Sequence, residues 1–158
     1  MKPLLMMTVV AAAFLVVPEH SSAQHVTRFG GVVVTTTVNG EQIAGVGGGA
    51  AIDLMGSWVS VGGQADLLTK NGYIAGRGGP IAQANLFRRG AFRVFGIGGV
   101  LWGVEDGPLF GGGVEVWSAG RLGFRATVHD STTKIKQDYR GTSYTKHRPS
   151  FQLGVAWR

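Results

Sequence analysis

Hydrophobic and polar residues alternate along most of this chain after residue 24. Eight stretches show the alternation, with groups of turn-forming residues between them. They span residues 30–38, 43–53, 58–68, 80–87, 92–102, 110–117, 122–130 and 150–158. Alternation with period two is typical of a β-strand with one apolar and one polar face. An even number of such strands favours antiparallel closure, so we expect an all-β, eight-stranded, up-and-down barrel.

The alternation itself leaves open which face is buried. In the seventh stretch, one face has Leu122, Phe124, Ala126 and Val128, and the other has Arg125, Thr127 and His129. A membrane barrel turns its apolar face outward, whereas a soluble sheet with one wet face gives the same letters reversed. A soluble periplasmic barrel that carries a small ligand would therefore point Phe151, Leu153, Val155 and Trp157 into a cavity.

The N-terminus has the pattern of a secretory signal peptide. Lys2 precedes an apolar run over residues 4–17, and small residues end the segment at Ser21, Ser22 and Ala23. This run is shorter than the roughly 20 residues that a spanning helix needs. We therefore expect residues 1–23 to be a signal peptide and residues 24–158 to form one barrel domain.

Composition supports a membrane barrel after export. The chain has no cysteine, which excludes disulfides, thiolate metal sites and a cysteine nucleophile. Only 15% of residues are charged, yet no second long apolar run follows residue 17. Many of the 27 glycines fall inside the alternating stretches, where they give room inside a narrow barrel. The net charge of +6 would suggest nucleic-acid binding in a cytoplasmic protein, but export disfavours it.

Three segments carry a resemblance to a known family. They are Gly-Gly-Gly-Val-Glu-Val-Trp at 111–117, Leu-Gly-Phe-Arg at 122–125, and the closing Phe-Gln-Leu-Gly-Val-Ala-Trp-Arg at 151–158. With the signal peptide, they make the chain resemble the small outer-membrane barrels of the OmpA/OmpX-like type from Gram-negative envelopes. The resemblance implies an outer-membrane location and help from the barrel-assembly machinery. Members usually end on an aromatic residue, whereas Arg158 follows Trp157 here.

Several polar residues are expected inside the barrel. A short turn that pairs Ser118 with Leu122 would place Glu115 beside Arg125 and Gly111 beside His129, all facing inward. The predicted lumen network is Glu115, Arg125, His129, Arg93, Gln64, Asp66, Gln83 and Asn85. Eight strands leave room for side chains or one small ligand, so we expect a plugged lumen without a wide pore. Trp117 shares the inward parity of Glu115 and is an alternative cap for that lumen.

The connections should differ between the two ends of the barrel. Those after the second, fourth and sixth stretches are short, and those after the third, fifth and seventh are longer, as in outer-membrane barrels. The longest spans residues 131–149 and is expected to form an external basic loop with Lys134, Lys136, Arg140, Lys146 and Arg148; Lys70 and Arg77 are expected in the third connection. Cations there could bind lipopolysaccharide phosphates.

One short pattern suggests chemistry. His129-Asp130-Ser131, followed by Ile135-Lys136-Gln137, resembles the His-x-Ser stretch of the outer-membrane lipid A deacylases, which implies an alternative esterase site at His129 and Ser131. By that family's spacing, the acidic residue that orients the histidine would fall at position 143, which is a serine in this chain. No metal or cofactor site is predicted. The leading expectation is a monomeric, non-enzymatic outer-membrane barrel with a structural or surface-interaction role.

Overall fold

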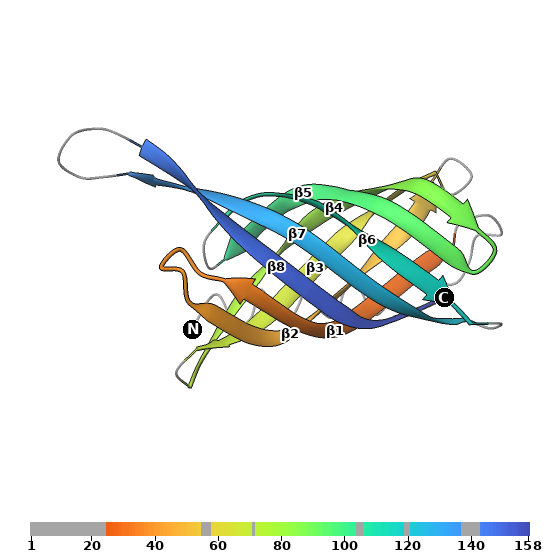
Figure 1. Cartoon of the computed structure of the whole chain (residues 1–158), viewed down its shortest axis with the longest axis horizontal. Helices are drawn as coiled ribbons and strands as arrows, with labels where there is room; N and C mark the ends of the chain where they lie inside the picture. Colours follow the sequence, from red (N-terminus) through yellow and green to blue (C-terminus); the bar gives the residue numbers. More distant parts are fainter. Residues whose placement is uncertain (1–24, 55–57, 71, 104–105, 119–120, 137–142) are drawn as a thin grey trace.

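The computed structural model describes residues 25–54, 58–70, 72–103, 106–118, 121–136 and 143–158, and these residues form a closed barrel of antiparallel strands (Figure 1). The strands are β1 (Val26–Thr36), β2 (Gln42–Leu54), β3 (Val59–Lys70), β4 (Tyr73–Arg89), β5 (Phe92–Gly103), β6 (Gly107–Trp117), β7 (Leu122–Lys136) and β8 (Ser143–Trp157). The predicted fold class and strand number are confirmed. Within the described part of the chain, no helix has the length and apolar character needed to cross a membrane.

Each strand pairs with its neighbours in sequence, and β1 pairs with β8 to close the sheet. Val32 of β1 lies opposite Val46 of β2 on one side and Leu153 of β8 on the other. Closure leaves no exposed sheet edge along the barrel wall, which removes the usual template for aggregation. The register expected between β6 and β7 is also observed, with Glu115 opposite Arg125.

Three strands extend furthest beyond the stretches that alternation predicted. β4 begins at Tyr73 rather than at residue 80, β7 continues to Lys136, and β8 begins at Ser143. The long connections predicted after the third and seventh stretches are therefore wrong: the third is reduced to residues 71–72, and the seventh to residues 137–142, which lie outside the described residues. The polar and glycine-rich sequence of these segments predicted loops. A strand can be predicted from sequence only where apolar and polar side chains alternate, whereas backbone pairing does not require that alternation. The extended ends of β7 and β8 form a ribbon that projects beyond the barrel rim in Figure 1.

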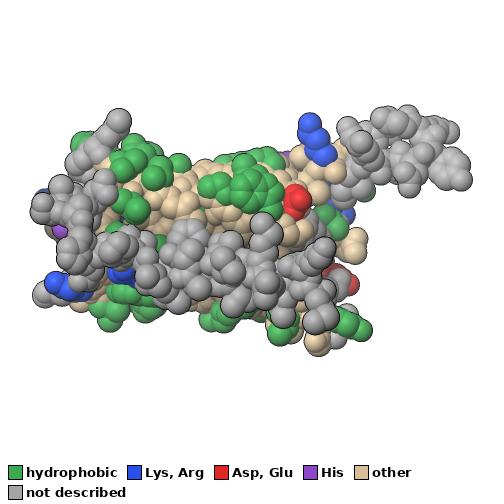
Figure 2. All heavy atoms as spheres, turned by 180° about the vertical axis from the view of Figure 1, so that it is seen from behind, with side chains coloured by type: hydrophobic (Ala, Val, Ile, Leu, Met, Phe, Trp, Pro, Cys, Tyr) green, Lys and Arg blue, Asp and Glu red, His purple; other side chains and the backbone are tan. Residues whose placement is uncertain are grey.

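Apolar side chains cover the outer wall. Those that point outward and remain exposed include Val32, Val34, Val46, Val61, Leu67, Leu86, Val100, Phe110, Val114, Val116, Leu122, Phe124, Val128, Phe151, Leu153 and Val155. Figure 2 shows such side chains spread over the wall, with the visible lysine and arginine side chains toward its two ends. Near the strand ends, Trp58, Tyr73 and Trp102 are also exposed.

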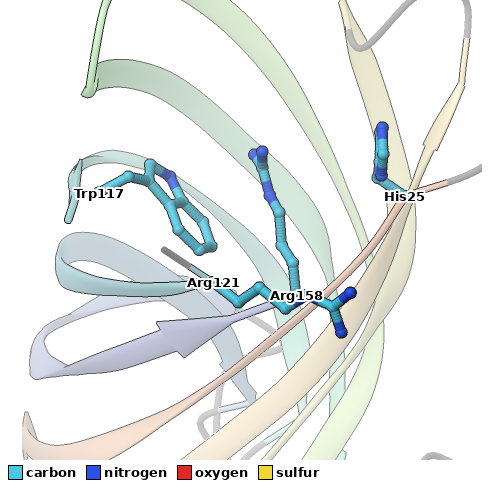
Figure 3. Close-up of a pocket in the computed structure, with 4 residues that line it drawn as sticks. All are labelled: His25, Trp117, Arg121 and Arg158. Carbon is cyan, nitrogen blue, oxygen red and sulfur yellow. The ribbon is translucent and has the colours of Figure 1, made fainter. Parts of the chain in front are cut away.

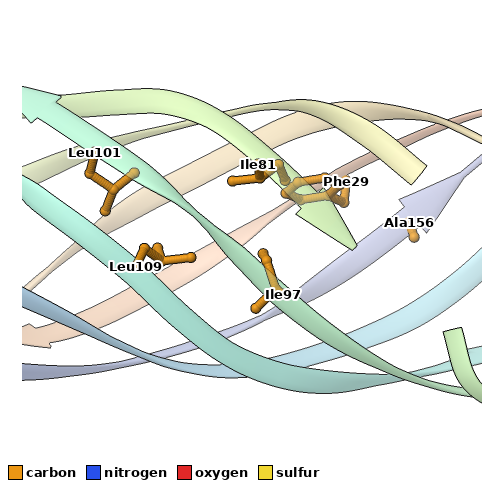
Figure 4. Packing of buried hydrophobic residues seen from close by; sticks show 6 residues of the cluster. All are labelled: Phe29, Ile81, Ile97, Leu101, Leu109 and Ala156. Atoms are coloured by element: carbon orange, nitrogen blue, oxygen red, sulfur yellow. The ribbon is translucent and has the colours of Figure 1, made fainter. Parts of the chain in front are cut away.

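The interior is packed rather than hollow at its centre. A small apolar cluster of Phe29, Ile81, Ile97, Leu101, Leu109 and Ala156 lies inside the barrel (Figure 4). Glycines on the inner face make this packing possible. A Cβ atom on Gly47 would lie 2.2 Å from Asp66 Oδ1 and 2.7 Å from Val33 Cγ2, so only glycine leaves space for the Asp66 carboxylate.

Candidate functional site

The polar residues expected in the lumen all lie inside the barrel wall. Each of the eight is buried: Gln64, Asp66, Gln83, Asn85, Arg93, Glu115, Arg125 and His129. Arg93 faces inward, because it lies opposite Glu115 across the β5–β6 pair and is buried. Burying charges is costly unless they are paired, so the contacts among these residues decide what the interior can do.

A cluster around Glu115 lies toward the end of the lumen where β6 and β8 end. Glu115 Oε1 accepts a hydrogen bond from Arg125 Nη1 at 2.5 Å, and Glu115 Oε2 accepts one from Arg93 Nη1 at 3.3 Å. Trp117 Nε1 donates to the same Oε2 at 3.2 Å. Because Trp117 is held against Glu115 in this way, it belongs to the interior rather than to an outer aromatic girdle.

Arg93 extends this cluster to neighbouring strands. Its Nε donates to Asn85 Oδ1, and its Nη2 lies 3.3 Å from Ser60 Oγ. Ser60 Oγ in turn donates to Asp53 Oδ1 at 2.7 Å. One network of charge-assisted hydrogen bonds therefore connects β2 through β7, and such connected networks fix the register of the strands that carry them.

Arg125 also stacks between two aromatic side chains. Its guanidinium carbon lies 4.0 Å from the ring centroid of Phe29 and 4.3 Å from that of Phe95. A desolvated cation between two aromatic faces gains cation–π attraction in addition to its ion pair. The three side chains, from β1, β5 and β7, together form a constriction inside the barrel.

A second ionic cluster lies toward the opposite end. Arg77 Nε donates to Asp66 Oδ2 at 2.9 Å, and its Nη2 lies 3.2 Å from Ser150 Oγ. The expectation that Arg77 lies in an external connection is wrong: its side chain is 2% exposed. The physical reason is the register of β3 and β4, which places Arg77 opposite Asp66. The arginine therefore forms its ion pair with the buried carboxylate inside the barrel. Sequence reasoning missed this pair because the run of glycines around residue 77 has no alternation.

The inner face of β7 and β8 carries buried polar atoms that have no partner among the described residues. They belong to Thr127, His129, Ser131 and Gln152. Thr127 lies opposite Gln152 in the register, and His129 and Ser131 follow along β7. Buried polar atoms of this kind usually bind ordered water. This face of the lumen is therefore suited to hold bound water.

His129 and Ser131 are not joined by a hydrogen bond. Both imidazole nitrogens and the Ser131 hydroxyl lack hydrogen-bond partners within the described chain, so the contact by which a histidine activates a serine is not seen there. The two side chains are 1% and 0% exposed and point into the lumen, away from any lipid outside. Ser143, at the position of the family's acid, begins β8. The structure thus gives the lipid A deacylase interpretation no support.

The residues predicted for the external basic loop fall on three kinds of position. Lys134 is exposed and Lys146 is partly exposed on the projecting ribbon. Lys136 ends β7, but its side chain is not among those described. Arg140 lies outside the described residues. Arg148 corrects the expectation, since it is a 1% exposed lumen residue opposite Ser131. Asp130 anchors the base of the ribbon by accepting hydrogen bonds from the Arg148 amide at 2.8 Å and contacting His147 Nδ1 at 2.5 Å.

The orientation of the apolar side chains of β8 argues against an internal site for an apolar ligand. Phe151, Leu153, Val155 and Trp157 are 37% to 45% exposed and face outward, opposite to what a soluble carrier would require. Within the described residues, no three His, Cys, Asp or Glu side chains come together in a way that could hold a metal ion.

The fold and the interior together define a class: closed eight-stranded antiparallel barrels with an apolar wall and a charged, packed lumen. Among solved structures, Neisserial surface protein A is similar, with a TM-score of 0.57 and 10% sequence identity over 86% of this chain and 97% of that chain. At this identity the likeness shows the fold alone. No protein-family model and no curated protein matches the sequence. The OmpA/OmpX-like resemblance stays a prediction.

Proposed function

We propose that this protein is a monomeric, non-enzymatic outer-membrane barrel with a plugged lumen, and that it contributes to envelope structure or surface interactions. The observation that carries the proposal is the sorting of side chains by face. Apolar side chains cover the outside, whereas ion pairs such as Arg125 with Glu115 and Arg77 with Asp66 lie inside. A soluble barrel would reverse this sorting, because charges are stable in water and apolar side chains are not.

The plugged lumen is supported by its packing. The Glu115 cluster, the constriction at Arg125 and the Asp66 cluster follow one another along the barrel. Eight-stranded barrels have an interior just wide enough for side chains, so this filling leaves a structural role as the simplest one. The absence of a hydrogen bond between His129 and Ser131 in the described chain favours a protein without esterase activity.

The surface role is proposed for the projecting ribbon of β7 and β8. In an outer-membrane barrel, both termini and the short turns face the periplasm, which puts the ribbon on the external side. Lys134 and Lys146 lie on it, and their ammonium groups are suited to lipopolysaccharide phosphates. Replacing both by glutamine should weaken binding to lipopolysaccharide vesicles, whereas Arg89→Gln, at the opposite end of the barrel, should not. Equal binding by all three proteins would contradict a role of the ribbon.

Membrane fractionation with heat-modifiable gel migration tests the location and the barrel together. The expected result is an outer-membrane protein that migrates faster before boiling than after, because a closed barrel resists detergent until heated. N-terminal sequencing should place the start of the mature chain near residue 24, as the signal peptide requires. A soluble protein with no shift on boiling would overturn the proposal. Conductance of planar bilayers containing the protein should stay at the level of empty bilayers if the lumen is plugged.

A further inference from the structure

A hollow with an unusual lining lies at the end of the barrel where β1 begins and β8 ends. Its volume is about 310 Å³, and His25, Trp117, Arg121 and Arg158 line it. In Figure 3 the two arginines lie between Trp117 and His25. Three of the four side chains are basic, and none is acidic. A volume of this size falls at the lower end of the range for small-molecule sites.

The backbone holds these four residues in place. The Arg158 amide donates to the Arg121 carbonyl at 3.0 Å. This hydrogen bond fixes the two arginines next to each other, although both β7 and β8 lie between them in the sequence. The Trp117 amide donates to the Ala91 carbonyl at 2.8 Å, and the His25 carbonyl accepts from the Asp53 amide at 3.0 Å. The hollow is therefore built by strand ends that the closed sheet positions.

Arg158 is preorganised for an anion. Its guanidinium carbon lies 4.2 Å from the ring centroid of Trp117, and its Nε is 3.4 Å from Thr27 Oγ1. An arginine stacked on an aromatic ring loses less side-chain freedom when it binds, and its planar group pairs with two oxygens of a phosphoryl group at once. No side-chain hydrogen bond or ion pair is found for Arg121 within the described residues, so its guanidinium is available to the same ligand.

The surrounding charges also favour an anion. Glu115, directly beneath Trp117, is already engaged by Arg93 and Arg125. A second, smaller hollow of about 80 Å³ adjoins the first, shares Trp117 and Arg158 with it, and adds Arg88 and Arg93. Burial is the largest cause that lowers the pKa of Arg158. The positive charges of Arg93 and Arg88 lower it further, whereas the negative charges of Asp53 and Glu115 raise it. An anion bound here would offset both the desolvation cost of the buried Arg158 guanidinium and its repulsion by Arg93 and Arg88.

We propose that this hollow is a binding site for a small phosphorylated molecule, with Arg121 and Arg158 holding a phosphoryl group and His25 adding a third donor. A multiply charged oxyanion fits better than a single carboxylate because several cations converge on one space. The site opens at the mouth of the lumen. Two sources could supply the phosphoryl group: a soluble phosphate compound or the headgroup of a neighbouring phospholipid.

Calorimetric titration with pyrophosphate tests the site on folded protein in nonionic detergent. The wild-type protein should bind, and Arg121→Gln and Arg158→Gln should each weaken binding at least about tenfold, since each removes a charge-assisted contact. Arg89→Gln is the matched control, because it makes the same change at an exposed arginine that ends β4 and lines neither hollow. Each variant should keep its heat-modifiable migration, which shows that the barrel remains folded.

A second arm distinguishes the two sources. In nanodiscs of phosphatidylcholine alone, pyrophosphate should bind as in detergent. If added phosphatidylglycerol competes, the natural ligand is a headgroup, and if it does not, the ligand is soluble; either result keeps the site. The proposal is overturned if wild-type protein fails to bind pyrophosphate, or if Arg89→Gln weakens binding as much as the Arg121 and Arg158 substitutions. Neither outcome depends on where the protein is located in the cell.

Discussion

Replacing Glu115 by glutamine tests whether ion pairs hold the plugged lumen together. Glu115 is fully buried, and its carboxylate forms ion pairs with two arginines, Arg93 at 3.3 Å and Arg125 at 2.5 Å. Glutamine keeps the shape of the side chain but removes its charge, so two buried cations lose their counter-charge. Removing one partner of a buried pair costs about 3–5 kcal/mol, which would be a large part of the stability of a small domain.

The measurement is the free energy of unfolding in urea, followed for the barrel folded into lipid vesicles. Glu41→Gln is the control for the same chemical change, because Glu41 is exposed in the turn between β1 and β2, and it should shift stability by no more than about 0.5 kcal/mol. The double variant Glu115→Gln with Arg125→Gln should lose less than the sum of the two single losses, by about 0.5–3 kcal/mol, since it removes both members of the pair.

Two results would refute this reasoning. One is a Glu115→Gln protein within about 1 kcal/mol of the wild type, which is the range of an exposed ion pair. The other is additivity of the two single substitutions within about 0.5 kcal/mol, the behaviour of residues that do not interact. Recovery in the double variant should remain incomplete, because Arg125 also loses its stacking between Phe29 and Phe95.

Two further substitutions probe the inner and outer faces. Gly47→Ala should destabilise the barrel by about 1–3 kcal/mol in the same urea assay, because its Cβ would meet the Asp66 carboxylate; Gly30→Ala, whose nearest neighbour would be 3.6 Å away, should be tolerated, and equal losses would contradict the packing argument. Val32→Arg, in the middle of the outer wall, should cost about 2–4 kcal/mol in lipid vesicles, whereas Tyr73→Arg at the rim should cost about 0–1; a neutral Val32→Arg would show that this face does not contact lipid.

Local sequence determined the number of strands and the direction in which most side chains point. Alternation has a period of two, the same as the pleat of a strand, so the inward positions of Glu115 and Arg125 follow from parity once a strand is assigned. The tight turn at Ser118 then sets the register between β6 and β7, with Ser118 donating to the Leu122 carbonyl at 2.8 Å. For these elements, the information lies in neighbouring residues.

Only the tertiary structure decided the features that depend on residues far apart in sequence. Arg77 and Arg148 lie inside because of the residues across their strand pairs, and no local pattern separates them from loop cations. The pocket at the barrel mouth needs closure of the sheet, which brings His25 near Arg158 from opposite ends of the described chain. Alternation also left open which face of the sheet is buried. The closed barrel decided it, because the charged face lies inside and the apolar face lies outside.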